Sequence, residues 1–173
     1  MSMPSFAAIR MLIVDPDASN AKSVLALLRD CGVKEINVSQ TIPDMLQHLA
    51  AQRVDIIFCN WVSNNLPALD LLKCVRNPKA SHNYRIPVIM IVSQPSIEQI
   101  TTARDLGATE FLAMPLSLKA MERVLTSLKL RPRDFIVDPA YIGPDRRRRK
   151  VDVAKERRGK SKTAAQNKET EKA

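Results

Sequence analysis

Apolar residues follow two different spacings along residues 1–130. Short continuous apolar runs are typical of strands buried in a sheet, whereas apolar residues that recur every three to four positions are typical of amphipathic helices. The runs, together with one alternating segment at 34–39, predict five strands, at residues 11–14, 34–39, 54–59, 87–92 and 110–114. The periodic segments predict five helices, the first ending at Gly32 and the others at residues 43–52, 68–76, 96–106 and 118–128.

The regular alternation of strands and helices predicts the fold class. Each helix supplies a crossover of about a dozen residues, which is what two parallel strands need to lie in one sheet. We therefore expect an α/β fold with a doubly wound five-stranded parallel sheet and helices on both faces. Functional groups in such folds lie at the carboxyl ends of the strands. The residues expected at that edge are Asp15, Asp17, Asn60, Val92, Ser93 and Met114.

Asn60 is the most informative of these residues, because it ends an apolar run that has the pattern of a buried strand. A carboxylate at such a strand end can take up a phosphoryl group as an acyl phosphate. A neutral amide has no anionic oxygen for that reaction. The alternative interpretation is a hydrogen-bonded polar strand end without any function.

Three blocks of sequence, in consistent order and without gaps, give a more specific signal. They are residues 60–76, which end in Leu-Leu-Lys-Cys-Val-Arg, residues 86–91 (Ile-Pro-Val-Ile-Met-Ile) and residues 106–115 (Leu-Gly-Ala-Thr-Glu-Phe-Leu-Ala-Met-Pro). With these blocks, residues 9–130 resemble the receiver domain of two-component response regulators, which has the CheY-like fold. The resemblance implies a signalling domain of a phosphorelay rather than an enzyme.

The resemblance also implies a set of site positions. In the family, two acidic residues hold a divalent cation and an aspartate accepts the phosphoryl group. A hydroxyl residue and an aromatic residue act as switches, and a lysine bonds the phosphoryl group. The acidic pair falls on Asp15 and Pro16, and the phosphoacceptor falls on Asn60. The hydroxyl switch falls on Val92, the aromatic switch on Phe111 and the lysine on Met114.

The joint departure at Pro16, Asn60, Val92 and Met114 predicts a degenerate member of the family, a pseudo-receiver. The nucleophile is missing, and the remnant acidic pocket of Asp15 and Asp17 offers few of the carboxylates that Mg²⁺ prefers. We therefore expect no catalytic residue, no cofactor and no metal ion. Helix capping is the preferred interpretation of the two aspartates, and core filling is that of Val92 and Met114.

Charge divides the chain at about residue 130. The net charge of +9 comes mostly from residues 131–173, which hold 14 Lys and Arg against 7 Asp and Glu, whereas residues 1–130 hold 13 against 11. We expect a receiver-like domain at 9–130 and a basic, largely disordered tail at 131–173. Candidate partner-binding residues in the tail are Phe135, Tyr141, Arg146, Arg147, Arg148, Arg149 and Lys150.

Three interpretations of the basic run at 146–150 stay open. The run can bind the phosphate backbone of a nucleic acid, or dock on an acidic protein surface with Phe135, Ile136 and Tyr141 as exposed anchors, or serve only as a solvated tail. Tyr141 also begins a Tyr-Ile-Gly-Pro-Asp-Arg-Arg-Arg segment. This segment resembles a short motif that follows receiver-like domains in some bacterial proteins.

Isolated cysteines and the apolar runs narrow the remaining possibilities. Cys31, Cys59 and Cys74 lack the spacing of a disulfide framework or metal site, and no run is long enough to span a membrane, so we expect a cytoplasmic protein. The leading hypothesis is a non-catalytic signalling adaptor whose partner is a histidine kinase or another two-component protein, with a homodimer as a further option. The alternatives are a nucleic-acid-associated regulator that uses the tail, and a receiver that joins phosphorelay signalling by unconventional means.

Overall fold

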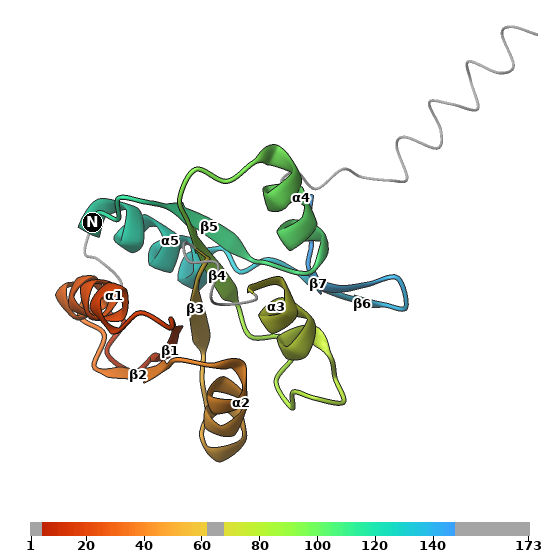
Figure 1. Ribbon diagram of the computed structural model, residues 1–173, viewed down its shortest axis with the longest axis horizontal. Coiled ribbons are helices and arrows are strands. Elements are labelled where there is room, and N and C mark those ends of the chain that lie inside the picture. Colours follow the sequence, from red (N-terminus) through yellow and green to blue (C-terminus); the bar gives the residue numbers. More distant parts are fainter. Residues whose placement is uncertain (1–4, 62–67, 148–173) are drawn as a thin grey trace, which may run out of the picture.

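The computed structural model describes residues 5–61 and 68–147. Its centre is a parallel sheet with the strand order β2-β1-β3-β4-β5 (Figure 1). The strands are β1 (Arg10–Val14), β2 (Glu35–Ser39), β3 (Ile56–Asn60), β4 (Val88–Val92) and β5 (Glu110–Ala113). The helices are α1 (Ala18–Asp30), α2 (Ile42–Ala51), α3 (Ala68–Arg76), α4 (Ile97–Asp105) and α5 (Leu118–Leu130). The predicted doubly wound α/β fold is confirmed.

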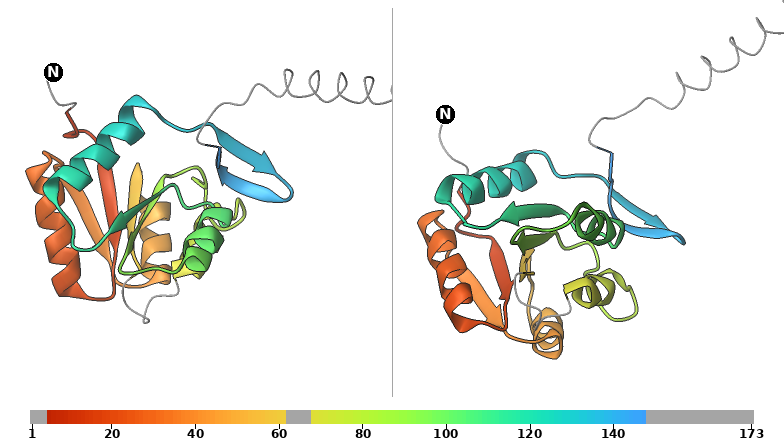
Figure 2. Two further views of the ribbon diagram at one scale, coloured as in Figure 1. Left: turned by 90° about the horizontal axis from the view of Figure 1, so that it is seen from above. Right: turned by 45° about the horizontal axis from the view of Figure 1, so that its top comes forward.

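Helices cover both faces of the sheet, with α1 and α5 on one face and α2, α3 and α4 on the other (Figure 2). Successive residues of a strand point to opposite faces, so β1 sends Leu12 and Val14 into one core and Met11 and Ile13 into the other. Strands buried on both faces need apolar residues at every position, which is why the sequence pattern identified them. Within the described part of the chain, no helix is both long and apolar enough to cross a membrane.

Polar residues at the carboxyl edge of the sheet start the helices that follow the strands. Asp17 is the N-cap of α1, where its carboxylate accepts hydrogen bonds from the backbone N–H groups of Ser19 and Asn20 at 2.7 and 3.3 Å. At α4, Ser96 and Gln99 form a capping box. Such caps satisfy backbone donors that the first turn of a helix leaves unpaired. The predicted capping role is confirmed for Asp17 and wrong for Asp15, which precedes the cap and accepts a hydrogen bond from the Asp17 backbone N–H.

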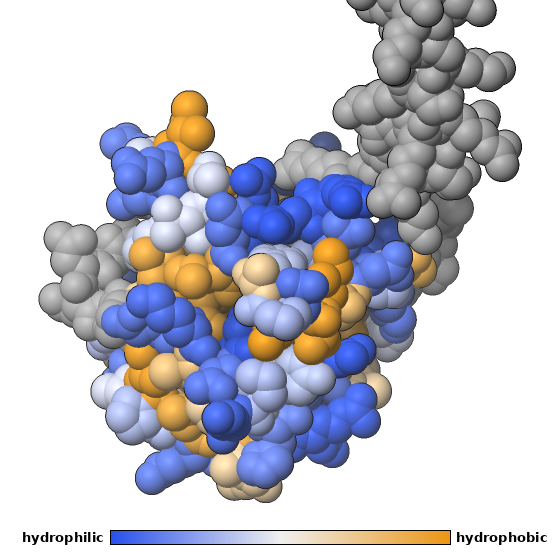
Figure 3. Space-filling model, turned by 90° about the vertical axis from the view of Figure 1, so that its right-hand side faces the viewer, coloured by the Kyte–Doolittle hydropathy of each residue, from blue (hydrophilic) through white to orange (hydrophobic). Residues whose placement is uncertain are grey.

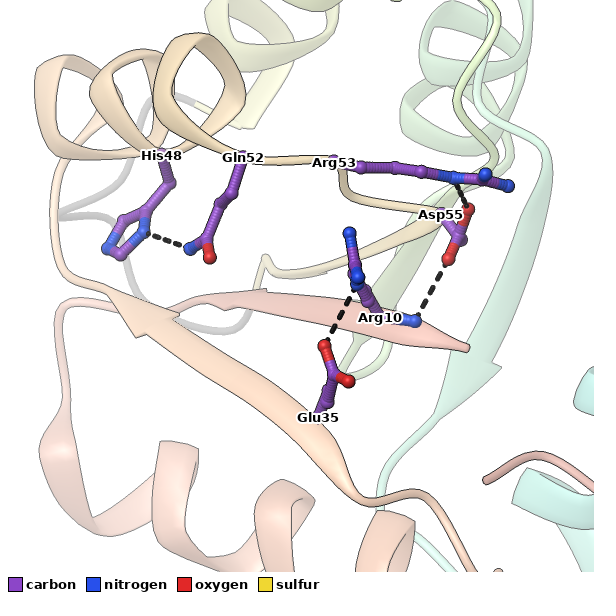
Figure 4. Close-up of polar contacts among 6 residues, drawn as sticks. All are labelled: Arg10, Glu35, His48, Gln52, Arg53 and Asp55. Atoms are coloured by element: carbon purple, nitrogen blue, oxygen red, sulfur yellow. Dashed lines mark hydrogen bonds and ion pairs between the residues drawn. The ribbon is translucent and has the colours of Figure 1, made fainter. Parts of the chain in front are cut away.

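A separate set of polar contacts ties the amino ends of the strands together (Figure 4). Arg10 at the start of β1 pairs with Glu35 at the start of β2, with 2.9 Å between Nε and Oε2. The Asp55 carboxylate, just before β3, accepts a hydrogen bond from the Arg10 backbone N–H at 3.0 Å and pairs with Arg53 at 2.8 Å. These contacts lie at the amino edge of the sheet, where they support the strand register. The candidate site lies at the opposite, carboxyl edge.

The segment after α5 differs from the expectation of a largely disordered tail. Residues 135–144 form an antiparallel hairpin of β6 (Phe135–Asp138) and β7 (Tyr141–Pro144) (Figure 1). Pro139 and Ala140 make the turn, and the Asp138 carboxylate accepts a hydrogen bond from the Ala140 backbone N–H at 2.8 Å. The Asp-Pro pair was the sequence signal for this turn. Residues 148–173 of the predicted tail lie outside the described residues.

Candidate functional site

Asp15 and Asn60 meet at the carboxyl edge of the sheet. Strands β1 and β3 are parallel neighbours with Val14 opposite Cys59, so the residues that follow these two lie side by side. Asn60 is 2% exposed and Asp15 is fully buried. The Asn60 amide Nδ2 donates a hydrogen bond to Asp15 Oδ2 at 2.5 Å. The sequence placed both residues at this edge, and the structure brings them into direct contact.

Asp15 is held in place by the β1–α1 turn. Its Oδ1 accepts a hydrogen bond from the Asp17 backbone N–H at 2.8 Å, and its own backbone N–H donates to the Ser39 carbonyl at 3.0 Å. Both carboxylate oxygens of Asp15 therefore have donors. The Asp17 carboxylate is directed to the first turn of α1 as its N-cap, so it does not add a second negative charge beside Asn60.

The contact between Asp15 and Asn60 sets the electrostatics of the site. An amide N–H that donates to a buried carboxylate stabilises the charged form of the acid. Two carboxylates at these positions would repel each other, and a bound cation would be needed to hold both charged. Cys59, the buried neighbour of Asn60, has its thiol pKa raised far above the usual range, first by burial and then by the negative charge of Asp15. The thiol therefore stays protonated and is no nucleophile.

The other family positions lie on β4 and β5. Val92 ends β4 and is 3% exposed within the apolar core, as predicted. Phe111 of β5 is half-buried and packs against that same core. Met114 is 40% exposed, which corrects the expectation that it fills the core. The reason is that β5 ends at Ala113, so Met114 is already in the turn at the solvated edge, where its backbone N–H donates to the Val92 carbonyl at 2.8 Å.

The donor set at this edge is small. Among residues 5–61 and 68–147, no group of three or more His, Cys, Asp or Glu side chains is arranged to hold a metal ion. Asp15 is the buried carboxylate of the site, and Pro16 occupies the place of its expected acidic neighbour.

The hairpin docks on the turn between α4 and β5 through two glycines. Gly107 has a φ of +93°, and a Cβ there would lie 2.8 Å from the Ile142 carbonyl oxygen. A Cβ on Gly143 would lie 2.8 Å from the Gly107 Cα. Neither position has room for a methyl group, so β7 and the turn approach each other as closely as two backbones can. The glycine of the Tyr-x-Gly-Pro-Asp-Arg segment is thus required by packing.

Tyr141 is part of the same docking contact, and its expected role as an exposed anchor is corrected. Its side chain is 9% exposed and its hydroxyl donates to the Pro144 carbonyl at 2.7 Å. Burial raises the pKa of the phenol, so Tyr141 keeps the proton for this hydrogen bond. Arg146 stacks on the Tyr141 ring, with its guanidinium carbon 4.3 Å from the ring centroid, and it pairs with Asp105 at 2.8 Å.

Arg76 is a buried residue whose role the sequence did not reveal. It ends α3, is 5% exposed, and donates to the Gly107 carbonyl through Nε at 3.0 Å and Nη2 at 2.8 Å. Its Nη1 donates to the carbonyls of Tyr84 and Ile86, both at 2.8 Å. The guanidinium carbon lies 5.4 Å from the ring centroid of Phe135, the first residue of the hairpin. Burial lowers the pKa of Arg76 to about 10, with a smaller opposing effect from Tyr141, so the side chain is charged at neutral pH.

The predicted partner-binding residues of the tail therefore separate into three groups. Phe135, Tyr141 and Arg146 take part in the docking of the hairpin, whereas Arg147 is exposed. The face on the hairpin side has hydrophobic patches interrupted by hydrophilic residues (Figure 3). Arg148, Arg149 and Lys150 lie outside the described residues.

Comparison with known proteins agrees with this architecture. The model of the response regulator receiver domain family matches residues 11–126. A two-component response regulator-like protein of Arabidopsis thaliana, APRR9, is 31% identical over 110 residues, which are 62% of this chain and 23% of that protein. The chemotaxis protein CheY-3 of Vibrio cholerae is 25% identical over 120 residues, which are 69% of this chain and 91% of CheY-3.

A solved structure shows the same fold. A two-component response regulator from Clostridium difficile superposes with a TM-score of 0.62 at 18% identity, over 73% of this chain and 99% of that one. The chain spans only about a quarter of the length of the plant relative. The family model, by contrast, accounts for most of the region from β1 to α5. The chain therefore belongs to the response regulator receiver domain family.

Proposed function

We propose that this receiver domain is a non-catalytic signalling adaptor, a pseudo-receiver that takes no phosphoryl group at Asn60. The observation that carries the proposal is the hydrogen bond from the Asn60 amide to the buried Asp15 carboxylate. The amide lies where the family has its phosphoacceptor, and its N–H group is directed at the neighbouring acid. An amide at this place has no anionic oxygen with which to form an acyl phosphate.

The residues around Asn60 support the same conclusion. A receiver that responds to phosphorylation needs a hydroxyl group to follow the phosphoryl group and a cation to bond it. Val92 carries an isopropyl group that is buried in the core, and Met114 carries an uncharged thioether. Neither side chain offers a phosphoryl oxygen the charged or hydroxyl donor that would hold it.

The donor set also does not fit a resident divalent cation. Mg²⁺ binds oxygen ligands in near-octahedral geometry, mostly carboxylates and water. Asp15 has donors on both oxygens, Asp17 caps α1, and Asn60 presents an N–H group to Asp15. Between two carboxylates, a bound cation would offset the repulsion of the two negative charges. Here an amide stands in place of one carboxylate, so Asp15 accepts a hydrogen bond from Asn60 and there is no second negative charge to offset. We therefore propose that the domain works without Mg²⁺.

The domain acts through protein contacts in this proposal. Receiver domains of two-component systems interact with histidine kinases or other signalling proteins, and the partner we expect is a protein of that kind. With no phosphoryl-driven change at the site, the domain presents one conformation to that partner. The contacts of Arg146 with Asp105 and Tyr141 do not favour the alternative in which this arginine binds nucleic acid.

Trp61 provides a direct test, because it is the single tryptophan of the chain and follows Asn60. Its backbone N–H donates to the Ile91 carbonyl at 2.7 Å, which fixes the main chain of Trp61 directly after Asn60. We would titrate the full chain with Mg²⁺ and then with beryllofluoride, a phosphoryl mimic, and follow the fluorescence of Trp61. In parallel, acetyl phosphate treatment followed by intact-mass measurement would detect an acyl phosphate.

The expected result is no saturable change in fluorescence and no added phosphoryl mass, in protein that circular dichroism shows to be folded. A receiver domain with the full acidic site serves as the positive control for both reagents. A saturable response to Mg²⁺ and beryllofluoride together, or a phosphorylated product, would show that the domain is a receiver that switches on phosphorylation.

A further inference from the structure

A groove is lined by residues of β5 and α5 and by residues just before and just after the hairpin. Figure 2 shows where these elements lie. The groove has a volume of about 630 Å³, which is within the range of small-molecule binding sites. Its charged lining residues are Glu110, Arg123, Arg131, Arg133 and Arg147. None of them takes part in the Asp15–Asn60 site.

The lining carries an excess of positive charge. Four arginines face one carboxylate, Glu110, which pairs with Arg133. Within residues 5–61 and 68–147, the side chains of Arg123, Arg131 and Arg147 form no ion pair, and all three are exposed. Three like charges around one hollow repel one another and focus a positive potential into it. A bound polyanion would relieve that repulsion.

The arginines converge from separate parts of the chain. Arg123 lies on α5, Arg131 is its C-cap, Arg133 lies in the link to the hairpin, and Arg147 follows β7. Arg147 reaches the groove only because the hairpin is docked, by the Gly107 contact and the neighbouring Arg146 ion pair. A solvated face of a single helix would not bring four guanidinium groups around one concave surface.

We propose that this groove binds an oligophosphate anion, such as the triphosphate group of a nucleotide, with its phosphates on the arginines. Planar guanidinium groups match phosphate oxygens with two parallel hydrogen bonds each, which makes arginine the preferred phosphate ligand. The Phe111 ring packs against the core on the other face of the sheet from α5, so recognition in the groove rests on the phosphates and not on a base. A compact, convergent hollow fits one such anion better than an extended acidic peptide, whose carboxylates are spread along a strand or helix. The proposal is independent of whether Asn60 accepts a phosphoryl group.

Calorimetric titration of the full chain distinguishes the possible ligands. We would titrate adenosine triphosphate, inorganic triphosphate, adenosine, a short single-stranded oligonucleotide and a poly-glutamate peptide, each at two salt concentrations. We expect saturable binding of adenosine triphosphate and of inorganic triphosphate with similar affinity, weakened in both cases by salt, and no binding of adenosine. If the same groove variants weaken the binding of the oligonucleotide, the phosphates that occupy the groove belong to a nucleic acid.

Variants locate the binding. The double variant Arg123→Gln/Arg131→Gln should lose affinity for adenosine triphosphate at least tenfold, whereas Arg29→Gln should leave it unchanged. Arg29 is a matched control because it is an exposed arginine in the last turn of α1, away from the groove. The double variant should weaken the binding of inorganic triphosphate to the same extent, because both ligands bind through their phosphates.

Three results would overturn the proposal. The first is no saturable binding of any phosphate anion by folded protein. The second is an equal loss of affinity in Arg29→Gln and in the double variant, which would mean that net charge alone causes binding. The third is binding of the poly-glutamate peptide with a preference over the nucleotide, which would make the groove a docking surface for an acidic protein.

Discussion

Replacing Asn60 with aspartate tests the central contact of the site. The two side chains have the same shape, so the substitution leaves the packing of β3 unchanged and alters only the chemistry. It removes the amide donor from Asp15 and puts a second carboxylate within hydrogen-bond distance of a residue that is fully buried. The folded protein must then tolerate two negative charges or take up a proton.

Both routes lead to a similar cost at neutral pH. Two unit charges about 4 Å apart repel by about 4 kcal/mol at an effective dielectric constant of about 20. Protonating the new carboxyl costs about 1.4 kcal/mol for each pH unit above its ordinary pKa of about 3.9, which is about 4 kcal/mol at pH 7. We therefore expect Asn60→Asp to destabilise the protein by about 4 kcal/mol at pH 7. At pH 5 the proton route costs only about 1.5 kcal/mol.

The dependence on pH identifies the cause. The folded-state pKa of the new carboxyl is raised above its unfolded value, so the folded variant holds a proton that the unfolded chain releases. Its stability relative to the parent is therefore best at low pH and falls as pH rises above about 4. Urea unfolding followed by the fluorescence of Trp61 and by circular dichroism, at pH 5 and pH 7, measures both values. Asn83→Asp is the matched control, because Asn83 is exposed and should change stability by less than about 0.5 kcal/mol.

Equal stabilities of Asn60→Asp and the parent at both pH values would refute the reasoning, because the buried amide–carboxylate contact could then contribute nothing. A loss that is the same at pH 5 and pH 7 would also refute it, since it would point to a packing defect. A loss that grows with pH by more than 1 kcal/mol is the expected signature.

Three further predictions address the rest of the molecule. Gly107→Ala should lower the free energy of unfolding in urea by at least 1 kcal/mol more than Gly32→Ala. Both glycines have a positive φ, but a Cβ at Gly107 would meet atoms at 2.8 Å, whereas a Cβ at Gly32 would meet nothing within 4 Å. Equal losses would show that the hairpin does not pack closely against this turn. Arg76→Met should destabilise the protein by about 3 kcal/mol, because it removes a charged donor from buried carbonyl groups. A loss below about 1 kcal/mol would contradict a structural role for these hydrogen bonds of Arg76. Cys59 should resist a thiol reagent at pH 8 until urea unfolds the chain, because burial raises its pKa; labelling as fast as in the unfolded chain would disprove its burial.

The pattern of apolar residues predicted the receiver-like part of the fold well, for a physical reason. A strand such as β4 is buried on both faces and must be apolar throughout, and a helix such as α5 must repeat its apolar residues with the helical period. The parallel order of the strands then places Asp15 and Asn60 at one edge. Their meeting was foreseeable because neighbouring parallel strands end at the same side of a sheet.

The hairpin and Met114 were not predicted correctly, and each case has its own cause. Two strands of only four residues each are too short to carry a periodic signal that distinguishes them from an extended tail. The stability of such a hairpin comes from what it packs against. Met114 was assigned to the core by its apolar character, but its exposure depends on where β5 ends, and strand ends are the least certain part of a sequence-based assignment.

The sequence by itself determined the sheet, the helices around it and the loss of acidic, hydroxyl and cationic groups from the family's site, because these depend on residue type and local spacing. Only the tertiary structure decided that Arg76 is buried among backbone carbonyls, that Gly143 lies against Gly107, and that four arginines line one groove. These features join residues that are tens of positions apart in the chain. The free energies of these contacts depend on the distances between elements that pack against one another. The local pattern of residues does not determine those distances.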